Sequence, residues 1–258
     1  MVNMTWLGLG VAFLAIFCGQ VLEGTSLTLL LQPTALLIVG GGTLGAILIQ
    51  SSAVDFRAAI AMLRWLREPP LTGKDHQVHE IVGWARLSYK QGALKLDGLC
   101  KSIQDPWLRN GVEMVVDCLD PEYIRQTMLM ELRVRDACMR RAVKVWESAA
   151  GYAPTIGILG SVLGLLRVMS TMQDAAAVGS GLAVAFVATF YGLSLANLVF
   201  LPVAHKLKVY VFEQTLRDEM RVEGLVMIAE NRQPWLVEKT LASFGAVNSN
   251  VVPLKVAA

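Results

Sequence analysis

The chain has 258 residues, of which 54% are hydrophobic and only 17% are charged, whereas soluble proteins carry roughly 25% charged residues. Its formal net charge of +2 excludes the strongly basic surface of a nucleic-acid-binding protein. Its four cysteines are spaced neither for a zinc site nor for a disulfide framework, and no glycine-rich phosphate loop is present. Composition therefore predicts an integral membrane protein without a cofactor.

Four stretches are apolar enough to cross a hydrocarbon core, which needs about 20 residues of helix. The first, from Thr5 to Leu22, is short enough to be mistaken for a signal peptide. It lacks a basic start and a small-residue cleavage pattern, so we interpret it as a span. The second runs from Pro33 to Gln50, the third from Ala149 to Met172 and the fourth from Ala175 to Ala204.

The distribution of basic residues predicts the orientation of these spans. Most of the 23 lysines and arginines lie between Ser51 and Ser148 or after Ala204, whereas the connectors near Glu23 and Asp174 contain none. Basic segments stay in the cytoplasm, so the central segment, the tail and both termini are expected there. The predicted fold class is an all-α polytopic membrane protein with four transmembrane helices and a large helical cytoplasmic insert between the second and third.

This plan divides the chain into four parts. They are a first transmembrane hairpin (1–50), the insert (51–148), a second hairpin (149–204), and a C-terminal helix with a tail (205–258). The segment AVDFRAAIAMLRWLREPP, after the second span, alternates Phe56 and Ile60 with arginines, which is typical of an amphipathic helix leaving the membrane.

Helix signals recur along the cytoplasmic segments. A helix is expected over Val78–Gln91, and Asp120, Pro121 and Glu122 combine an N-cap, a first-position proline and an acidic first turn. The helix that they begin is predicted to continue into the third span, which would couple cytoplasm and membrane mechanically. The segment His205–Arg232 is expected to extend the fourth span and pack on the insert. The final residues show no pattern.

Small and slightly polar residues recur at steps of three and four along one face of the third span: Pro154, Gly157, Ser161, Gly164 and Val168. Pro154 frees a backbone carbonyl and can bend the helix. Gly160 and Gly164 form a GxxxG pair, a close-approach surface for another helix. These faces can serve either of two purposes, to pack helices together or to line a polar path.

Small-residue faces also occur in the fourth and second spans. The fourth span has a stripe of Gly181, Ala185, Ala188, Gly192 and Ala196. Thr189 adds a hydroxyl beside it, and the second span has Gly41 and Gly45. Hydroxyl groups at Ser161 and Thr189 could ligate a cation or hold a proton-carrying water, but they do not ionise at neutral pH. Because neither of the last two spans contains Asp or Glu, a partner would have to supply the titratable group.

Arg167 is the one full charge inside a span, in its outer third. Two interpretations remain open. Its long side chain can extend to the outer interface, or it can steer cations at the mouth of an ion path.

The segments GYAPTIGILGSVLGLLRVM and GSGLAVAFVATFYGLSLANLVFLPVAHKLK resemble the two ion-path spans of the MotA/PomA family of flagellar motor stator subunits, closest to its MotC-like branch. LEG after the first span and GGTLGAILIQS in the second are also similar to that family. The resemblance implies an ion-channel subunit of the bacterial inner membrane that converts ion flow into torque on the rotor.

The family also implies partners. Five copies surround two copies of a MotB-like single-span subunit, which carries the essential Asp, and the insert engages the rotor protein FliG. By resemblance, Pro154 and Pro202 match the prolines thought to couple ion binding to cytoplasmic movement, and Thr189 matches a threonine near the ion site. Ser161 stands where sodium-driven members usually have Thr and proton-driven members often have Ala. We favour a proton over sodium as the driving ion, with Ser161 and Thr189 as the sodium ligands otherwise.

The rotor-facing motif departs from the family. The usual pattern is Arg, two residues, Gly, and Glu five positions later, whereas YKQGALKLD has Tyr89 and Asp97 at the charged positions. Lys90 and Arg86 keep positive charge nearby. Alternatively these are ordinary solvated charges, since exposed charges contribute little.

Two further functions remain as alternatives. A TolQ/ExbB-like proton-channel subunit would energise an outer-membrane process and would have three spans. A passive membrane scaffold would have no ion path. An enzyme is not expected, because His76 and His79 have no evident nucleophile or metal partner in the sequence.

Overall fold

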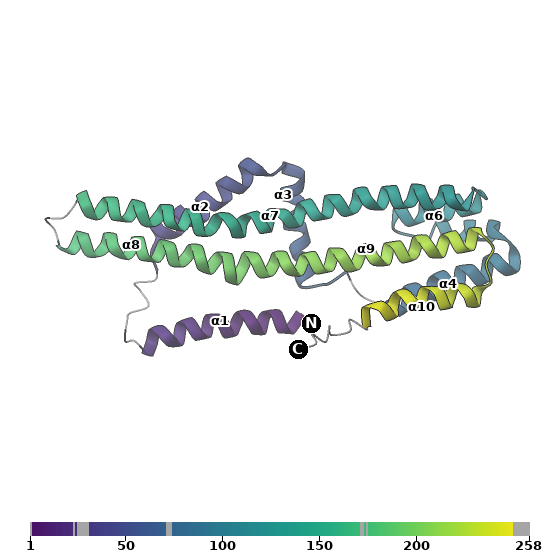
Figure 1. The fold of residues 1–258 in the computed structure, drawn as a ribbon, viewed down its shortest axis with the longest axis horizontal. Helices are drawn as coiled ribbons and strands as arrows, with labels where there is room; N and C mark the ends of the chain where they lie inside the picture. The colour runs from purple at the N-terminus through teal and green to yellow at the C-terminus, as the bar shows by residue number, and fades with distance from the viewer. Residues whose placement is uncertain are drawn as a thin grey trace, which may run out of the picture. The chain divides into compact units, whose positions relative to one another are not determined.

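The computed structural model describes most of the chain, namely residues 2–22, 24, 31–70, 74–170, 173 and 175–249. The predicted connectors at Glu23 and Asp174 and the side chain of His76 lie outside the described residues. The elements run in the order α1 (Val2–Leu22), α2 (Pro33–Gln50), α3 (Ala53–Met62), η2 (Leu63–Leu66), α4 (Lys74–Gln91), η3 (Ala93–Leu96), α5 (Asp97–Cys100), α6 (Pro106–Val116), α7 (Pro121–Ser170), α8 (Ala175–Ser194), η4 (Leu195–Phe200), α9 (Leu201–Ala229) and α10 (Pro234–Ser249) (Figure 1).

Every described helix and turn is consistent with the predicted all-α class, and no strand occurs within the described ranges. Three described helices contain stretches long and apolar enough to cross a membrane: Pro33–Gln50, Pro121–Ser170 and Val178–Ala229. A shorter apolar stretch of α1, Leu7–Leu22, accompanies them. An all-helical protein with membrane-length helices is therefore confirmed, while the count of four spans stays a prediction.

The long helix predicted to run into the third span is confirmed. α7 extends over 50 residues without interruption, with Pro154 inside it. Its start is fixed as the sequence indicated, because the Asp120 carboxylate accepts a hydrogen bond from the Tyr123 backbone N–H at 3.2 Å. Pro121 then occupies the first helical position, where its missing N–H costs least.

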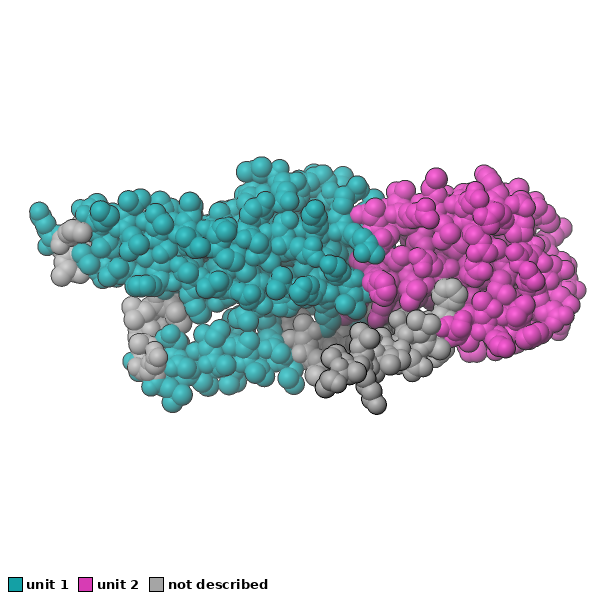
Figure 2. Space-filling view, in the orientation of Figure 1, with its two compact units in different colours: residues 1–69, 138–209 teal, residues 70–137, 210–258 magenta. Residues whose placement is uncertain are grey.

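The chain forms two compact units, each built from two separate segments (Figure 2). The first comprises residues 1–69 and 138–209, and the second comprises residues 70–137 and 210–258. α3 and the segment 138–148 group with the apolar helices of the first unit. The predicted parts divide the chain at the expected membrane boundaries, and they stay a prediction. Both α7 and α9 contribute residues to both units.

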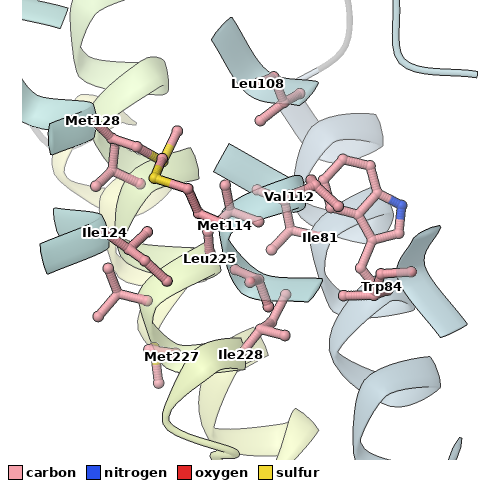
Figure 3. Packing of buried hydrophobic residues seen from close by; sticks show 14 of the residues in the cluster. Ile81, Trp84, Leu108, Val112, Met114, Ile124, Met128, Leu225, Met227 and Ile228 are labelled. Carbon is pink, nitrogen blue, oxygen red and sulfur yellow. The ribbon is translucent and has the colours of Figure 1, made fainter. Parts of the chain in front are cut away.

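The second unit has a core of buried apolar side chains from α4, α6, α7 and α9, with Ile81, Val112, Ile124 and Leu225 at 1% exposure or less (Figure 3). The expected packing of the C-terminal helix on the insert is confirmed, because Leu225 of α9 lies in the same cluster as the insert residues.

The sequence interpretation missed one element. α10 begins with Pro234 in its first turn and buries Val237 and Leu241 completely in the core of the second unit. Its signal was present in the sequence, since a proline followed by apolar residues at steps of three and four is typical of a short amphipathic helix.

The core contact of Leu225 gives a direct stability test. Leu225→Ala is expected to lower the thermal midpoint of the detergent-purified chain, because losing a fully buried leucine costs about 2–5 kcal/mol. Leu94→Ala is the matched control, since Leu94 is 76% exposed. Intrinsic tryptophan fluorescence reports the transition through Trp84 and Trp107, which lie in the same core. An equal shift in both variants would contradict this account of the core.

Candidate functional site

The α7 and α8 helices approach each other until their backbones touch. A Cβ added at Gly164 would lie 2.8 Å from the backbone nitrogen of Ala185. One added at Gly192 would lie 2.5 Å from the carbonyl oxygen of Ala153. Real Cβ atoms do not occupy such positions, so these glycines permit the contact. The sequence left open whether the small-residue faces pack helices together or line a polar path. At Gly164 and Gly192 they pack helices together.

The α2 helix covers one side of this helix pair. A Cβ at Gly42 would lie 2.7 Å from the Cγ2 atom of Ile156, and one at Gly160 would lie 3.3 Å from the Cγ2 atom of Ile38. Val39 of α2 is buried in one cluster with Ala188 of α8.

The close approach of α2 uses a different glycine from the pair that the sequence singled out. Neither Gly41 nor Gly45 would bring an added Cβ within 4 Å of a neighbour in the described part of the chain, whereas Gly42 would. The helical phase explains the difference, because Ala35, Val39 and Thr43 set the buried face and Gly42 flanks it.

Pro154, Ser161 and Thr189 lie on the side that α2 leaves uncovered. Successive helix residues are rotated by about 100°. In α8, Val187 packs with α2 and Ala188 faces α7, so Thr189 lies beyond the contact on the far side. In α7, Gly160 contacts α2, so Ser161 lies on the far side too, with Pro154 within about 20° of it.

We call this uncovered side the polar strip, defined by Pro154, Ser161 and Thr189. All three side chains are half-buried. The flanking apolar residues are not covered by other parts of the same chain, since Ile158 and Leu193 are 58% and 50% exposed. The strip is thus a shallow line of small polar groups beside apolar surface.

The hydroxyl chemistry of the strip is limited. The Thr189 hydroxyl donates to the carbonyl oxygen of Ala185 at 3.4 Å, a weak bond that leaves its oxygen lone pairs available. No group of three or more His, Cys, Asp or Glu placed to hold a metal ion occurs among the described residues. The strip can accept hydrogen bonds from water or offer oxygen to a cation, but it supplies no titratable group.

Two features of the first unit were not anticipated. The segment η4, between α8 and α9, is a π-helix just before Pro202, and the Asn197 side chain donates to the carbonyl of Leu193 at 2.9 Å. Because proline cannot donate to the preceding turn, relaxed pairing there is expected, and Pro202 was the available signal. Thr43 of α2 is only 2% exposed, and its hydroxyl lacks a hydrogen-bond partner in the described structure.

Comparisons with known proteins identify relatives of this chain. Residues 100–220 match the MotA/TolQ/ExbB proton channel family, and residues 6–85 match the motility protein A N-terminal family. Motility protein A of Aquifex aeolicus is 32% identical, with 92% of this chain and 94% of that protein covered. Motility protein A of Bacillus subtilis is 30% identical, with 92% and 88% covered. The chain belongs to the MotA/PomA family.

A solved structure extends this similarity to the fold. The flagellar MotAB stator complex from Bacillus subtilis contains a chain that is 28% identical, with a TM-score of 0.84 and coverage of 97% of this chain and 100% of that one. The all-helical architecture is therefore that of the MotA/PomA family.

The rotor-interface candidates of this MotA/PomA-family chain lie on the surface of the second unit. Arg86, Tyr89 and Lys90 belong to the last turns of α4, and Asp97 begins α5. All four are exposed. Arg86 forms an ion pair at 3.2 Å with Glu238 of α10, the helix that the sequence interpretation missed.

The second unit also buries charges that the sequence interpretation did not single out. Asp218 is 2% exposed, and its carboxylate accepts a hydrogen bond from Arg221 at 3.0 Å. Burial raises the pKa of this carboxyl, and Arg221 and Arg135 oppose the rise. Arg217, 8% exposed, donates to the carbonyl of Pro70 at 3.2 Å, and burial lowers the pKa of its guanidinium.

Arg167 lies exposed in the last turn of α7. Its backbone carbonyl accepts a hydrogen bond from the Ser170 hydroxyl at 2.8 Å. Both interpretations of its side chain remain open.

The backbone contact between α7 and α8 predicts that alanine substitution has different effects on stability at Gly192 and at Gly41. Gly192→Ala is expected to destabilise the helix pair, because overpacking costs about 1–3 kcal/mol, more than the gain of up to about 1 kcal/mol from helix propensity. Gly41→Ala changes the same atoms at a position with no neighbour within 4 Å among the described residues. Protease resistance of the detergent-purified chain should fall only in the first variant. Equal resistance in the two variants would refute the close packing.

The burial of Asp218 predicts a pH dependence. A carboxyl with a raised folded-state pKa binds its proton more tightly when folded, so its contribution to stability is greatest below the unfolded pKa of about 3.9 and is lost as pH rises through the folded pKa. Asp218→Asn should therefore gain thermal stability relative to wild type as pH rises from acid to neutral. Asp117→Asn, an exposed carboxylate, is the control. A constant difference between Asp218→Asn and wild type would contradict the raised pKa.

Proposed function

We propose that the chain is the ion-conducting subunit of a flagellar stator and that a proton drives it. The polar strip carries this proposal. It combines two hydroxyls and a proline on the uncovered side of two glycine-packed helices, and neither expected span contains a carboxylate. A strip of this kind can hold a chain of water but needs an acid from elsewhere.

The missing acid defines the partner. We infer that a MotB-like single-span subunit brings the essential Asp against the polar strip, in an assembly of five copies of this chain around two of the partner. Membership of the MotA/PomA family and the similarity to a MotAB stator complex support this partner. The exposed apolar residues beside the strip, Ile158 and Leu193, would then be covered by the partner or by a neighbouring copy.

The proton is favoured over sodium by the small number of oxygen ligands. A dehydrated hard cation needs several oxygens in its first shell, whereas the strip offers the hydroxyls of Ser161 and Thr189. A proton moving along water needs only acceptors that orient the water. If sodium were the driving ion, these two residues would be its protein ligands.

The topology that fits this function has four spans in the bacterial inner membrane, with both termini and the insert in the cytoplasm. Most basic residues lie in the segments assigned to the cytoplasm. Movement at Pro154 and Pro202 would pass along α7 and α9, each of which contributes to both compact units. Arg86, Tyr89, Lys90 and Asp97 would then meet the rotor protein FliG. No catalytic step or cofactor is required.

Motility in defined ions tests the proposal. A deletion strain complemented with this chain and its neighbouring partner gene should swim in sodium-free buffer and stop when a proton uncoupler is added. Swimming that requires sodium and survives the uncoupler would instead assign sodium to Ser161 and Thr189. Failure to swim in either condition, with both proteins in the membrane, would favour the TolQ/ExbB-like or scaffold alternative.

Matched hydroxyl variants locate the path within the same assay. Thr189→Val removes the hydroxyl of the polar strip while keeping the shape of the side chain, and it should reduce swimming speed strongly. Thr155→Val makes the same change at an exposed position of α7, where the hydroxyl only bonds the carbonyl of Tyr152 at 2.8 Å. Equal effects in the two variants would argue against a path at the strip.

A further inference from the structure

The helix that follows α2 presents arginines and apolar side chains together on one exposed face. We call it the arginine face, defined by Val54, Arg57 and Ile60 of α3, Arg64 of η2 and Arg67 directly after η2. All five residues are exposed, with Val54 at 75% and Ile60 at 51%. Within α3, steps of three residues make Val54, Arg57 and Ile60 neighbours along one side of the helix, and Arg64 and Arg67 follow at steps of four and three.

The opposite face of α3 is fixed to the rest of the first unit. Ala59 and Met62 are buried at 0% and 6% exposure. The carbonyl of Ala59 accepts a hydrogen bond from the indole Nε1 of Trp146 in α7 at 3.1 Å. The orientation of α3 is therefore set by its buried side, and the arginine face points away from α7.

The position of α3 in the chain places this face at the edge of the hydrocarbon. α2 ends at Gln50 and α3 begins at Ala53, so only two residues separate them. The Ser52 hydroxyl caps α3 by accepting a hydrogen bond from the backbone N–H of Asp55 at 3.1 Å. With α2 spanning the membrane as proposed, a helix separated from it by two residues would lie at the interface, where mixed apolar and basic side chains are favourable.

The charges of the arginine face are not neutralised by any acid that the structure describes. Across the described ranges, none of Arg57, Arg64 and Arg67 belongs to an ion pair. The nearest acid on α3, Asp55, pairs with Arg141 of α7 at 3.4 Å. Glu68 follows Arg67 directly, and with three arginines the face keeps a net positive charge.

We propose that the arginine face binds the headgroups of anionic phospholipids in the cytoplasmic leaflet. The proposal rests on the membrane orientation given under the proposed function. Val54 and Ile60 would enter the acyl boundary, while the three guanidinium groups donate hydrogen bonds to lipid phosphates. Through the Trp146 contact, bound lipid would hold the segment of α7 beside α3 at a fixed depth.

Lipid enrichment around the complete complex with its partner subunit tests the proposal. The complex is placed in nanodiscs of phosphatidylcholine mixed with phosphatidylglycerol, extracted gently, and its retained lipids are counted by native mass spectrometry. The variant carries Arg57→Gln, Arg64→Gln and Arg67→Gln. Phosphatidylglycerol affinity should fall by about fivefold for each arginine removed, with phosphatidylcholine unchanged.

A matched control separates this effect from a change in total charge. Lys101→Gln, Arg133→Gln and Arg232→Gln remove three exposed basic residues from the second unit. This variant should retain phosphatidylglycerol like wild type. Equal losses in the two variants, or no loss in the first, would overturn the proposal.

A spin label identifies what covers the face. Ala61, an exposed position beside Ile60, is changed to Cys after the exposed Cys18, Cys118 and Cys138 are changed to Ser. High accessibility of the label to oxygen, together with low accessibility to an aqueous nickel complex, supports lipid at this face. High nickel access indicates water, and spin–spin broadening indicates a second copy of the chain; either result overturns the proposal.

A second label distinguishes failure of the lipid surface from failure of the proposed membrane topology. Leu44→Cys lies in the middle of α2, at a position that is 52% exposed. Its label should report the hydrocarbon whether or not lipid headgroups bind the arginine face. If the label at Leu44 is in water, the membrane topology is wrong; if only the label at Ala61 is in water, the topology holds and the lipid surface fails.

Discussion

The backbone contact between α7 and α8 is the constraint on which the rest of the first unit depends. At Gly164 and Gly192 a single added carbon would collide with the backbone of the facing helix. Lipid provides no hydrophobic force between helices, so close van der Waals contact must hold them together. Once this contact fixes the two helices in rotation, α2 can cover only one side, and Pro154, Ser161 and Thr189 are left on the other.

The fixed rotation of α7 and α8 also determines where the hydroxyl groups lie. Small residues face the neighbouring helix, and the next residues along the chain supply hydroxyls at the edge of the contact. The strip has no acid, so a protein that used it to move ions would need a partner's carboxylate. The same constraint applies to α3, where the burial of Ala59 and Met62 leaves Arg57 exposed on the other side of the helix.

The second unit follows ordinary rules of a soluble domain. Its core draws on α4, α6, α7, α9 and α10, and it tolerates buried charge because Asp218 is paired with Arg221. Apolar periodicity in α9 predicted that the tail would pack on the insert. The pairing of Arg86 with Glu238 could not be predicted, since it joins residues that are far apart in the chain and depends on how α10 packs against α4.

The sequence by itself determined the all-α membrane class, the uninterrupted α7 and its cap at Asp120, because these depend on local composition and on the nearest turn. It also supplied the residues of the polar strip. Only the tertiary structure decided which glycine of α2 makes contact, that a π-helix precedes Pro202, and that Asp218 is buried. These properties depend on helix rotation and on neighbours distant in the chain, and a periodic pattern specifies a face without specifying what lies against it.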